Sequence, residues 1–283
     1  MATLVTARSG GVVEHLNPIA LLSNLWRHRD LIRQFTRRAV EGRYRGSFLG
    51  VFWSFVNPLM QLLIYTFVFG IVFRSRWPQA RTPDLQEFAV VLFCGIITFN
   101  IFGESVSLAP GLIVGVPNYV KKVVFPLEIL PVTALGAALF HALVGLTIVL
   151  VTNLLVTGVV QWTLILLPLV VLPLVCLSLG LTWFLASLGV FIRDINYLIG
   201  LIVQMLFFAS AIFYAVEAIP EPFRTLALFN PLLWEVENVR RVVLWGQLPS
   251  WLHLGIWSLV GILLMLLGYA WFMKTKKAFA DVI

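Results

Sequence analysis

The sequence predicts an all-α integral membrane protein with six transmembrane helices. Its residues are 60% hydrophobic and only 12% charged, whereas soluble domains have about 45–50% apolar and about 25% charged residues. The mean hydropathy is +0.96, and six apolar runs are long enough to cross a hydrocarbon core of about 30 Å. This composition excludes an ordinary soluble enzyme and a disordered protein. The net charge of +7 indicates basic residues on the cytoplasmic side of a membrane, so we expect no nucleic-acid partner.

Residues 1–47 are expected to form a cytoplasmic N-terminal segment that contains an amphipathic helix in the membrane interface. Asn17-Pro18 is typical of an N-cap followed by proline at the first helical position. The helix either breaks near His28 or directs Arg29 and Arg33 toward lipid phosphates, because both lie close to its apolar stripe. The alternative is a solvated basic helix. The apolar stripe consists of Ile19, Leu22, Leu25 and Trp26, followed by Ile32, Phe35 and Ala39.

Residues 48–283 are expected to form one six-span transmembrane domain. Eight arginines precede the first span, and the predicted loops leave most of the remaining lysines and arginines on the same side. Basic residues mark the cytoplasmic side, so we expect both termini there. The spans are predicted at 50–73, 88–109, 128–157, 163–190, 195–215 and 251–273.

The segment from Ala215 to Pro249 follows the fifth span and differs from the spans. Its part from Leu228 to Trp245 carries Glu235, Glu237, Arg240 and Arg241 among apolar neighbours. It is too charged to cross lipid and too apolar for a free loop. We therefore expect a pair of short interfacial or re-entrant helices on the external side.

Polar and aromatic side chains recur at steps of four along the first span, so they share one slowly winding face. Amides are costly against lipid, and this face is therefore expected to line a cavity or a helix contact. Amides bind hydroxyl groups and flat rings stack on sugars, which suits passage of a sugar polymer. A polar contact that seals the subunit fits equally well. The stripe is Trp53, Asn57, Gln61, Tyr65 and Phe69, and the fifth span offers Asn196, Gln204, Phe207 and Tyr214 as its counterpart.

Two further features lie toward the cytoplasmic side. Glu104 is an acidic residue within a span, and we interpret it as the partner of a basic group of the N-terminal segment. Residues 115–126 contain Asn118, Tyr119, Lys121 and Lys122 between proline breakers. They are expected to form either a short helix that serves a partner protein or a simple turn.

Motifs of common enzymes are absent from the sequence. It has no phosphate-binding loop, no H-E-x-x-H, no C-x-x-C and no G-x-S-x-G. Its four histidines form no group in the sequence, and its two cysteines lie in separate apolar runs. We predict no catalytic residue, no metal site and no cofactor in this chain.

A family resemblance rests on several motifs in a fixed order. The run from Arg43 to Gly50, followed by Trp53 and Asn57-Pro58-Leu59, resembles the entry to the first span of bacterial polysaccharide exporter permeases of the ABC-2 type. The similarity covers residues 17–283. It continues through Lys121–Pro126, Phe191–Asp194, Phe213-Tyr214, Asn230-Pro231 and the tail Phe279–Ile283.

This resemblance implies a homodimer joined to two copies of a separate ATPase subunit, which binds the ATP and Mg²⁺. The implied substrate is a lipid-linked polysaccharide of O-antigen type, with teichoic acid or capsule as alternatives. Asn118, Tyr119, Lys121 and Lys122 then belong to the helix that couples to the ATPase, and the helices after span five become external gate helices. The stripe becomes the substrate channel, and Arg38, Arg43 and Arg45 a place for the carrier's diphosphate.

Two other classes of protein remain as alternatives. A membrane-embedded transferase of lipid-linked sugars needs acids or histidines grouped near the interface. An ion-coupled secondary carrier usually places several ionisable groups in its spans.

Overall fold

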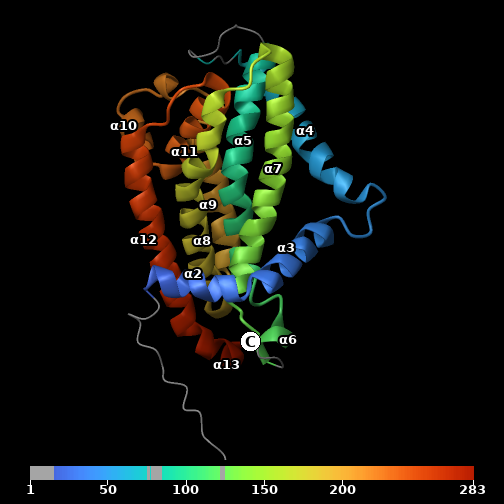
Figure 1. Ribbon diagram of the computed structural model, residues 1–283, viewed down its shortest axis with the longest axis vertical. Helices are drawn as coiled ribbons and strands as arrows, with labels where there is room; N and C mark the ends of the chain where they lie inside the picture. Colours follow the sequence, from blue (N-terminus) through green and yellow to red (C-terminus); the bar gives the residue numbers. More distant parts are fainter. Residues whose placement is uncertain (1–15, 75–76, 78–84, 122–124) are drawn as a thin grey trace, which may run out of the picture.

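The computed structural model describes residues 16–74, 77, 85–121 and 125–283, and these residues form helices and connecting segments without a β-strand (Figure 1). Among the described residues, five helical stretches are long and apolar enough to cross a membrane. The fold is therefore all-helical, as predicted. The five stretches are Trp53–Val72 (α4, Trp53–Tyr65, and the π-helical η2, Thr66–Val72), Leu85–Gly111 (α5, Leu85–Leu108), Ile129–Thr157 (α7), Trp162–Phe191 (α8, Leu167–Phe191) and Trp251–Val282 (α12, Trp251–Thr275).

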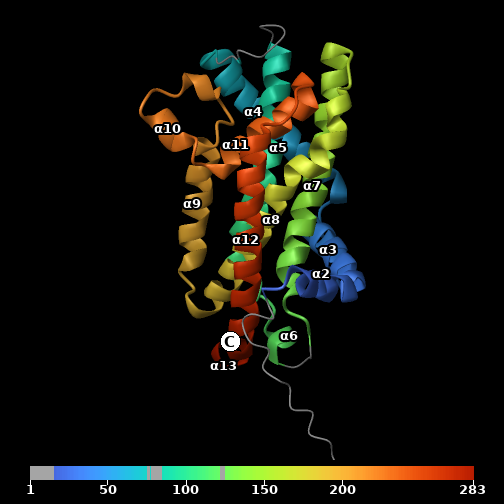
Figure 2. The ribbon, with the colours of Figure 1, turned by 60° about the vertical axis from the view of Figure 1, so that its left-hand side comes forward.

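The remaining predicted span is shorter than expected. Helix α9 (Ile195–Ala209) has 15 residues, about 22 Å at 1.5 Å per residue, against a core of about 30 Å. The prediction extended it to residue 215, but the backbone leaves the helical course after Ser210, and Ala211 adopts a φ of 51°. Helix α9 forms one edge of the bundle (Figure 2).

Helix α5 is the central element, and most of its side chains are buried. It packs against α7, α8, α9 and α11 (Pro231–Arg240). A mostly apolar helix is expected in such a position, since neighbouring helices cover most of its sides.

Helices α8 and α12 approach each other closely along small residues. A Cβ atom on Gly268 would lie 2.1 Å from the carbonyl oxygen of Gly180, and one on Gly180 would lie 2.5 Å from the backbone of Leu264. Small residues at such positions let helix backbones make extensive van der Waals contact, which is the main source of helix association in lipid.

The N-terminal segment contains two helices, α2 (Pro18–Arg27) and α3 (Arg29–Arg43), with the break at His28. The Asn17 side chain accepts a hydrogen bond from the amide of Ile19 at 2.9 Å, as its predicted N-cap role requires. Helix α2 lies across one end of the bundle (Figure 1) and leaves Ile19, Leu22 and Trp26 exposed. The break therefore separates the apolar stripe of α2 from the arginines of α3.

Helix α2 is fixed to the bundle by buried polar contacts. Its Asn24 side chain donates to the Tyr269 hydroxyl at 2.9 Å and to Glu128 at 3.3 Å, and Glu128 pairs with Lys276 at 2.6 Å. Burial opposes ionisation of Glu128, but the hydrogen bond and charge of Lys276 outweigh it and lower the Glu128 pKa. The same end of the bundle carries α6 (Pro117–Lys121) and α13 (Phe279–Val282) (Figure 1).

Helices α10 (Phe223–Ala227) and α11 lie toward the other end of the bundle (Figures 1 and 2). Asn230 caps α11 by accepting the amide of Leu232 at 3.0 Å. Burial raises the pKa of Glu235 on α11 to about 8, so its carboxyl is mainly uncharged near neutral pH. In its uncharged form the Glu235 carboxyl can be buried in the bundle at a lower cost.

Candidate substrate path

Helices α3, α4, α5 and α7 enclose a polar cavity of about 320 Å³. A second, adjoining cavity of about 710 Å³ extends along α5 and α7. We use "the polar cavity" for the two together. The side chains common to both are Arg43, Gln61, Asn100, Glu104 and His141.

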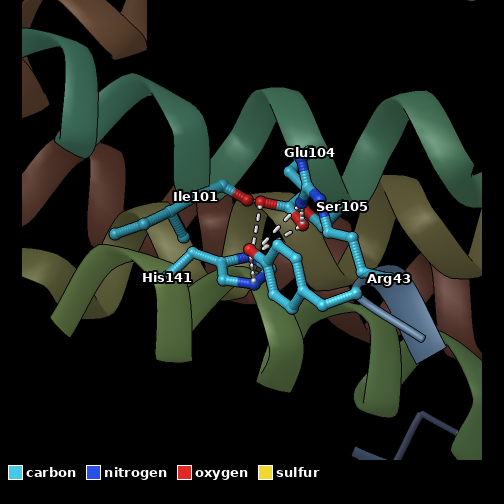
Figure 3. A network of polar contacts seen from close by, with 6 residues as sticks. Arg43, Ile101, Glu104, Ser105 and His141 are labelled. Carbon is cyan, nitrogen blue, oxygen red and sulfur yellow. Dashed lines mark hydrogen bonds and ion pairs between the residues drawn. The ribbon is translucent and has the colours of Figure 1, made fainter. Parts of the chain in front are cut away.

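An ionic cluster at this cavity joins the end of α3 to α5 and α7 (Figure 3). Arg43 donates from Nη1 to Glu104, and His141 Nδ1 lies 2.9 and 3.0 Å from the two Glu104 oxygens. Tyr44 places its hydroxyl 3.2 Å from His141 Nε2. The expectation that Glu104 pairs with a basic group of the N-terminal segment is confirmed, and that group is Arg43. We call Arg43, Tyr44, Glu104 and His141 the Glu104 cluster.

The carboxylate contacts indicate the donors and acceptors of the Glu104 cluster, in which Arg43 Nη1 also lies 3.3 Å from His141 Nδ1. A carboxylate only accepts, so His141 donates to it from Nδ1 and keeps Nε2 as an acceptor. Burial raises the pKa of Tyr44, so its hydroxyl keeps its proton and donates to Nε2. Glu104 thus accepts from two donors on different helices.

The N-terminal half of the predicted stripe contributes to the polar cavity. Asn57 and Gln61 line it together with Ser54 and Pro58. Trp53 lies at the start of α4 and donates from its indole nitrogen to the Ser47 hydroxyl at 2.7 Å. The structure therefore divides the stripe into a polar part and an aromatic part.

The aromatic part of the stripe packs against rings from other elements. Tyr65 lies 6.0 Å from Phe207 on α9 and 5.1 Å from Phe213, measured between ring centroids. Phe69 stacks on Phe213 at 4.4 Å, and Phe207 also contacts Phe99 of α5 at 5.1 Å. The π-helical turn of η2 holds more residues than an α-helical turn, which keeps steps of four on the same side. These rings pack into one continuous cluster, which we call the aromatic surface; Phe99, Phe207 and Phe213 are buried in it, and Tyr65 and Phe69 are half-buried.

The predicted residues of the fifth span are divided between two environments. Phe207 is buried in the aromatic surface, and the Tyr214 hydroxyl donates to the Phe208 carbonyl oxygen at 2.7 Å. Asn196 and Gln204 are exposed on α9. The structure therefore brings Phe207 to the stripe and leaves both amides outside this contact.

The three arginines proposed for the carrier diphosphate also have different positions. Arg43 lines the polar cavity. Arg38 is exposed, with its guanidinium 5.8 Å from the Phe35 ring centroid, and Arg45 is exposed after the end of α3. The geometry thus favours Arg43 as the anion contact at the cavity.

The predicted coupling segment contains the short helix α6. Tyr119 stacks on Phe125 at 4.7 Å and meets the edge of Phe35 on α3 at 5.8 Å. Asn118 and Lys121 are exposed, whereas Lys122 lies outside the described residues. Tyr119 therefore attaches α6 to the N-terminal segment, and Asn118 and Lys121 are left for an external contact.

Sequence reasoning missed two features of this region. The first is His141, which joins an acid on another helix rather than a second histidine. The sequence signal that could have revealed the pair was the presence of one ionisable side chain, Glu104 or His141, in each of two consecutive spans. The second is Arg240, which was counted only as an external charge. Its side chain is 1% exposed, and its guanidinium donates to the carbonyl oxygens of Val91, Ala211 and Ile212 at 3.2, 2.9 and 2.9 Å.

Within the described ranges, no group of three or more His, Cys, Asp or Glu side chains is arranged to hold a metal ion. The described helices form an apolar bundle, with the polar cavity between α3, α4, α5 and α7 and the aromatic surface where α4 and η2 meet α9. This arrangement is that of a helical membrane protein.

Comparison with known proteins gives the family. Residues 30–244 match the ABC-2 type transporter family, and the chain belongs to this family. The O-antigen export system permease protein RfbA of Myxococcus xanthus is 28% identical over 94% of this chain and 100% of its own length. The same-named permease of Klebsiella pneumoniae is 28% identical over 90% of this chain and 95% of its own. The polysialic acid transport protein KpsM of Escherichia coli is 24% identical over 85% and 92%.

Proposed function

We propose that this chain is the permease subunit of an ATP-driven exporter that moves a lipid-linked polysaccharide of O-antigen type across the bacterial inner membrane. The observation that carries the proposal is that α4 contributes Gln61 to the polar cavity and, one turn farther on, Tyr65 to the aromatic surface of Tyr65, Phe69, Phe207 and Phe213. Polar side chains bind hydroxyl and phosphate groups, and rings stack on sugars without holding them tightly. The full-length match to O-antigen export permeases supports the same substrate class.

A capsule polysaccharide is the second candidate substrate. It is favoured by the similarity to the polysialic acid transport protein, which extends over 92% of that relative. Vesicles that contain the purified permease and its ATPase should take up the lipid-linked glycan of the host's O-antigen when ATP is added. Uptake of a capsule glycan alone would select the second candidate, and uptake under an ion gradient without ATP would contradict an ATP-driven exporter.

We further propose the assembly and orientation that the family implies. Two copies of this chain bind two copies of a separate ATPase subunit, which holds ATP and Mg²⁺. Both termini face the cytoplasm, with α2 in the membrane interface beside lipid head groups. Helix α9 and the residues after it complete a sixth crossing, and α10 and α11 act as external gate helices.

The aromatic surface can be tested at Tyr65. Tyr65→Leu keeps apolar bulk but removes the ring and the hydroxyl, so we expect export to fall severalfold while the melting temperature changes little, because such swaps usually cost less than about 1.5 kcal/mol. Phe67→Leu is the matched control, because Phe67 lies on the same helix with 57% of its surface exposed. Equal export by both variants would show that Tyr65 only packs between helices and does not contact the glycan. Vesicle uptake of the glycan is the measurement.

The docking role of α6 can be tested at its exposed side chains. The double variant Asn118→Asp, Lys121→Glu should bind the ATPase about tenfold more weakly, which corresponds to about 1.4 kcal/mol. The permease dimer should stay intact and, alone, should hydrolyse no ATP. Lys277→Glu changes charge at an exposed site on the same end of the bundle and should leave binding unchanged. Co-purification of the ATPase at wild-type level with the double variant would remove α6 from the docking surface.

A further inference from the structure

The polar cavity has an anion-binding side chain that is already occupied. Arg43 is the last residue of α3, and its side chain is 51% exposed. Its guanidinium is hydrogen-bonded to Glu104, whose side chain is 18% exposed. Of the pair, Arg43 is therefore the more accessible to a ligand in the cavity, and its guanidinium already has a carboxylate partner.

We propose that Glu104 is a built-in competitor that sets the selectivity of the anion site on Arg43. In the substrate-free chain the carboxylate occupies the guanidinium, and the diphosphate of the lipid carrier displaces it. This inference rests on the proposed function and adds to it a residue that decides which anions bind.

His141 makes the exchange possible. Both Glu104 oxygens lie within 3.0 Å of His141 Nδ1, so the carboxylate keeps a hydrogen-bond donor after Arg43 has left it. His141 is itself held by the Tyr44 hydroxyl at 3.2 Å. A carboxylate left without any partner in this half-buried place would be costly, and His141 removes most of that cost.

The exchange discriminates by charge. A diphosphate carries more negative charge than a carboxylate and offers several oxygens to the guanidinium fork, so it wins the competition. An anionic phospholipid head group carries a single negative charge, as the Glu104 carboxylate does. Arg43 would exchange one monovalent partner for another and gain little. Glu104 therefore keeps the abundant anionic lipids of the membrane off Arg43 and admits the scarce lipid diphosphate.

The test is a binding measurement on the full-length permease in nanodiscs of phosphatidylcholine, with farnesyl diphosphate as the probe. Glu104→Gln cannot compete as an anion, and we expect it to tighten diphosphate binding about tenfold, because hydrogen bonds to charged groups are the strong ones. Arg43→Gln should weaken binding at least tenfold. The double variant should match Arg43→Gln, since Glu104 acts only through Arg43.

Three arms identify the anion and its source. Farnesol lacks the diphosphate and should not bind, and inorganic pyrophosphate should bind more weakly than the lipid diphosphate. Nanodiscs with added phosphatidylglycerol should weaken probe binding to Glu104→Gln much more than to the wild type. Equal binding of pyrophosphate and farnesyl diphosphate would assign the site to free phosphates and overturn the carrier role. Glu128→Gln removes a different buried ion pair, that with Lys276, and serves as the matched control with unchanged affinity.

The opposite result is equally clear. If Glu104→Gln weakens binding as Arg43→Gln does, Glu104 positions Arg43 and does not compete with the ligand. Glu104→Asp provides a second variant. Its shorter side chain withdraws the carboxylate from Arg43, so its diphosphate affinity should lie between those of the wild type and Glu104→Gln. Unchanged affinity in all variants, together with ATP-driven glycan export by the wild type, would overturn the competitor role and leave the proposed function intact. Absence of glycan export in the complete complex would instead overturn the proposed function.

Discussion

Replacing Arg240 with leucine should destabilise the permease severely. Arg240 is buried between α11, α5 and the segment after α9, and its guanidinium donates to three backbone carbonyl oxygens. The Val91 carbonyl lies within α5 and keeps its helical hydrogen bond, whereas Ala211 and Ile212 lie outside a helix. Each buried acceptor left without a donor costs about 1–3 kcal/mol. We therefore expect a loss of several kcal/mol, seen as a large drop in melting temperature and in the yield of folded protein.

The structure supplies controls for this prediction. Arg224→Leu removes an arginine on α10 whose side chain is 36% exposed, and it should have a small effect. Arg240→Lys keeps the charge but lacks the planar fork that reaches three carbonyls, so its melting temperature should lie between those of the wild type and Arg240→Leu. A Cβ atom on Gly95 would lie 2.6 Å from Arg240 Nη2, and Gly95→Val should therefore resemble Arg240→Leu. A wild-type melting temperature for Arg240→Leu would show that these carbonyls need no donor.

The second large effect is expected where α8 and α12 meet. Gly268→Ala places a Cβ atom 2.1 Å from the Gly180 carbonyl oxygen, so the two backbones have to separate. Overpacking of this kind typically costs about 1–3 kcal/mol. Gly180→Ala should have a comparable effect, because its Cβ meets the backbone of Leu264 at 2.5 Å.

Gly255 provides a matched control on the same helix. A Cβ atom on Gly255 has nothing within 4 Å, so Gly255→Ala should be neutral or raise stability by about 0.5–1 kcal/mol through helix propensity. Thermal unfolding of the three purified variants compares the same chemical change at three positions. If Gly268→Ala and Gly255→Ala have the same melting temperature, the close approach of α8 and α12 is unimportant for stability.

The candidate site was partly accessible to sequence reasoning. The spacing of four residues predicted a common face for the stripe, and the structure places Gln61 at the polar cavity and Tyr65 in the aromatic surface. The in-span acid Glu104 was expected to pair with the N-terminal segment, and it does so with Arg43. Asn196 and Gln204 were expected opposite the stripe but are exposed on α9, because spacing along one helix does not fix how that helix is turned toward another.

The sequence by itself determined the class of protein and most of its helices. Hydrophobic length and the Asn17 cap act through residues close together in the chain, so they can be recognised without a structure, whereas the break at His28 was one of two alternatives until the structure showed it. Only the tertiary structure decided where α9 ends, since Arg240 binds the carbonyl oxygens of Ala211 and Ile212 from a distant helix. It also decided which base meets Glu104, because Arg43, Glu104 and His141 come from three helices. Their pairing depends on how those helices pack, which no local pattern encodes.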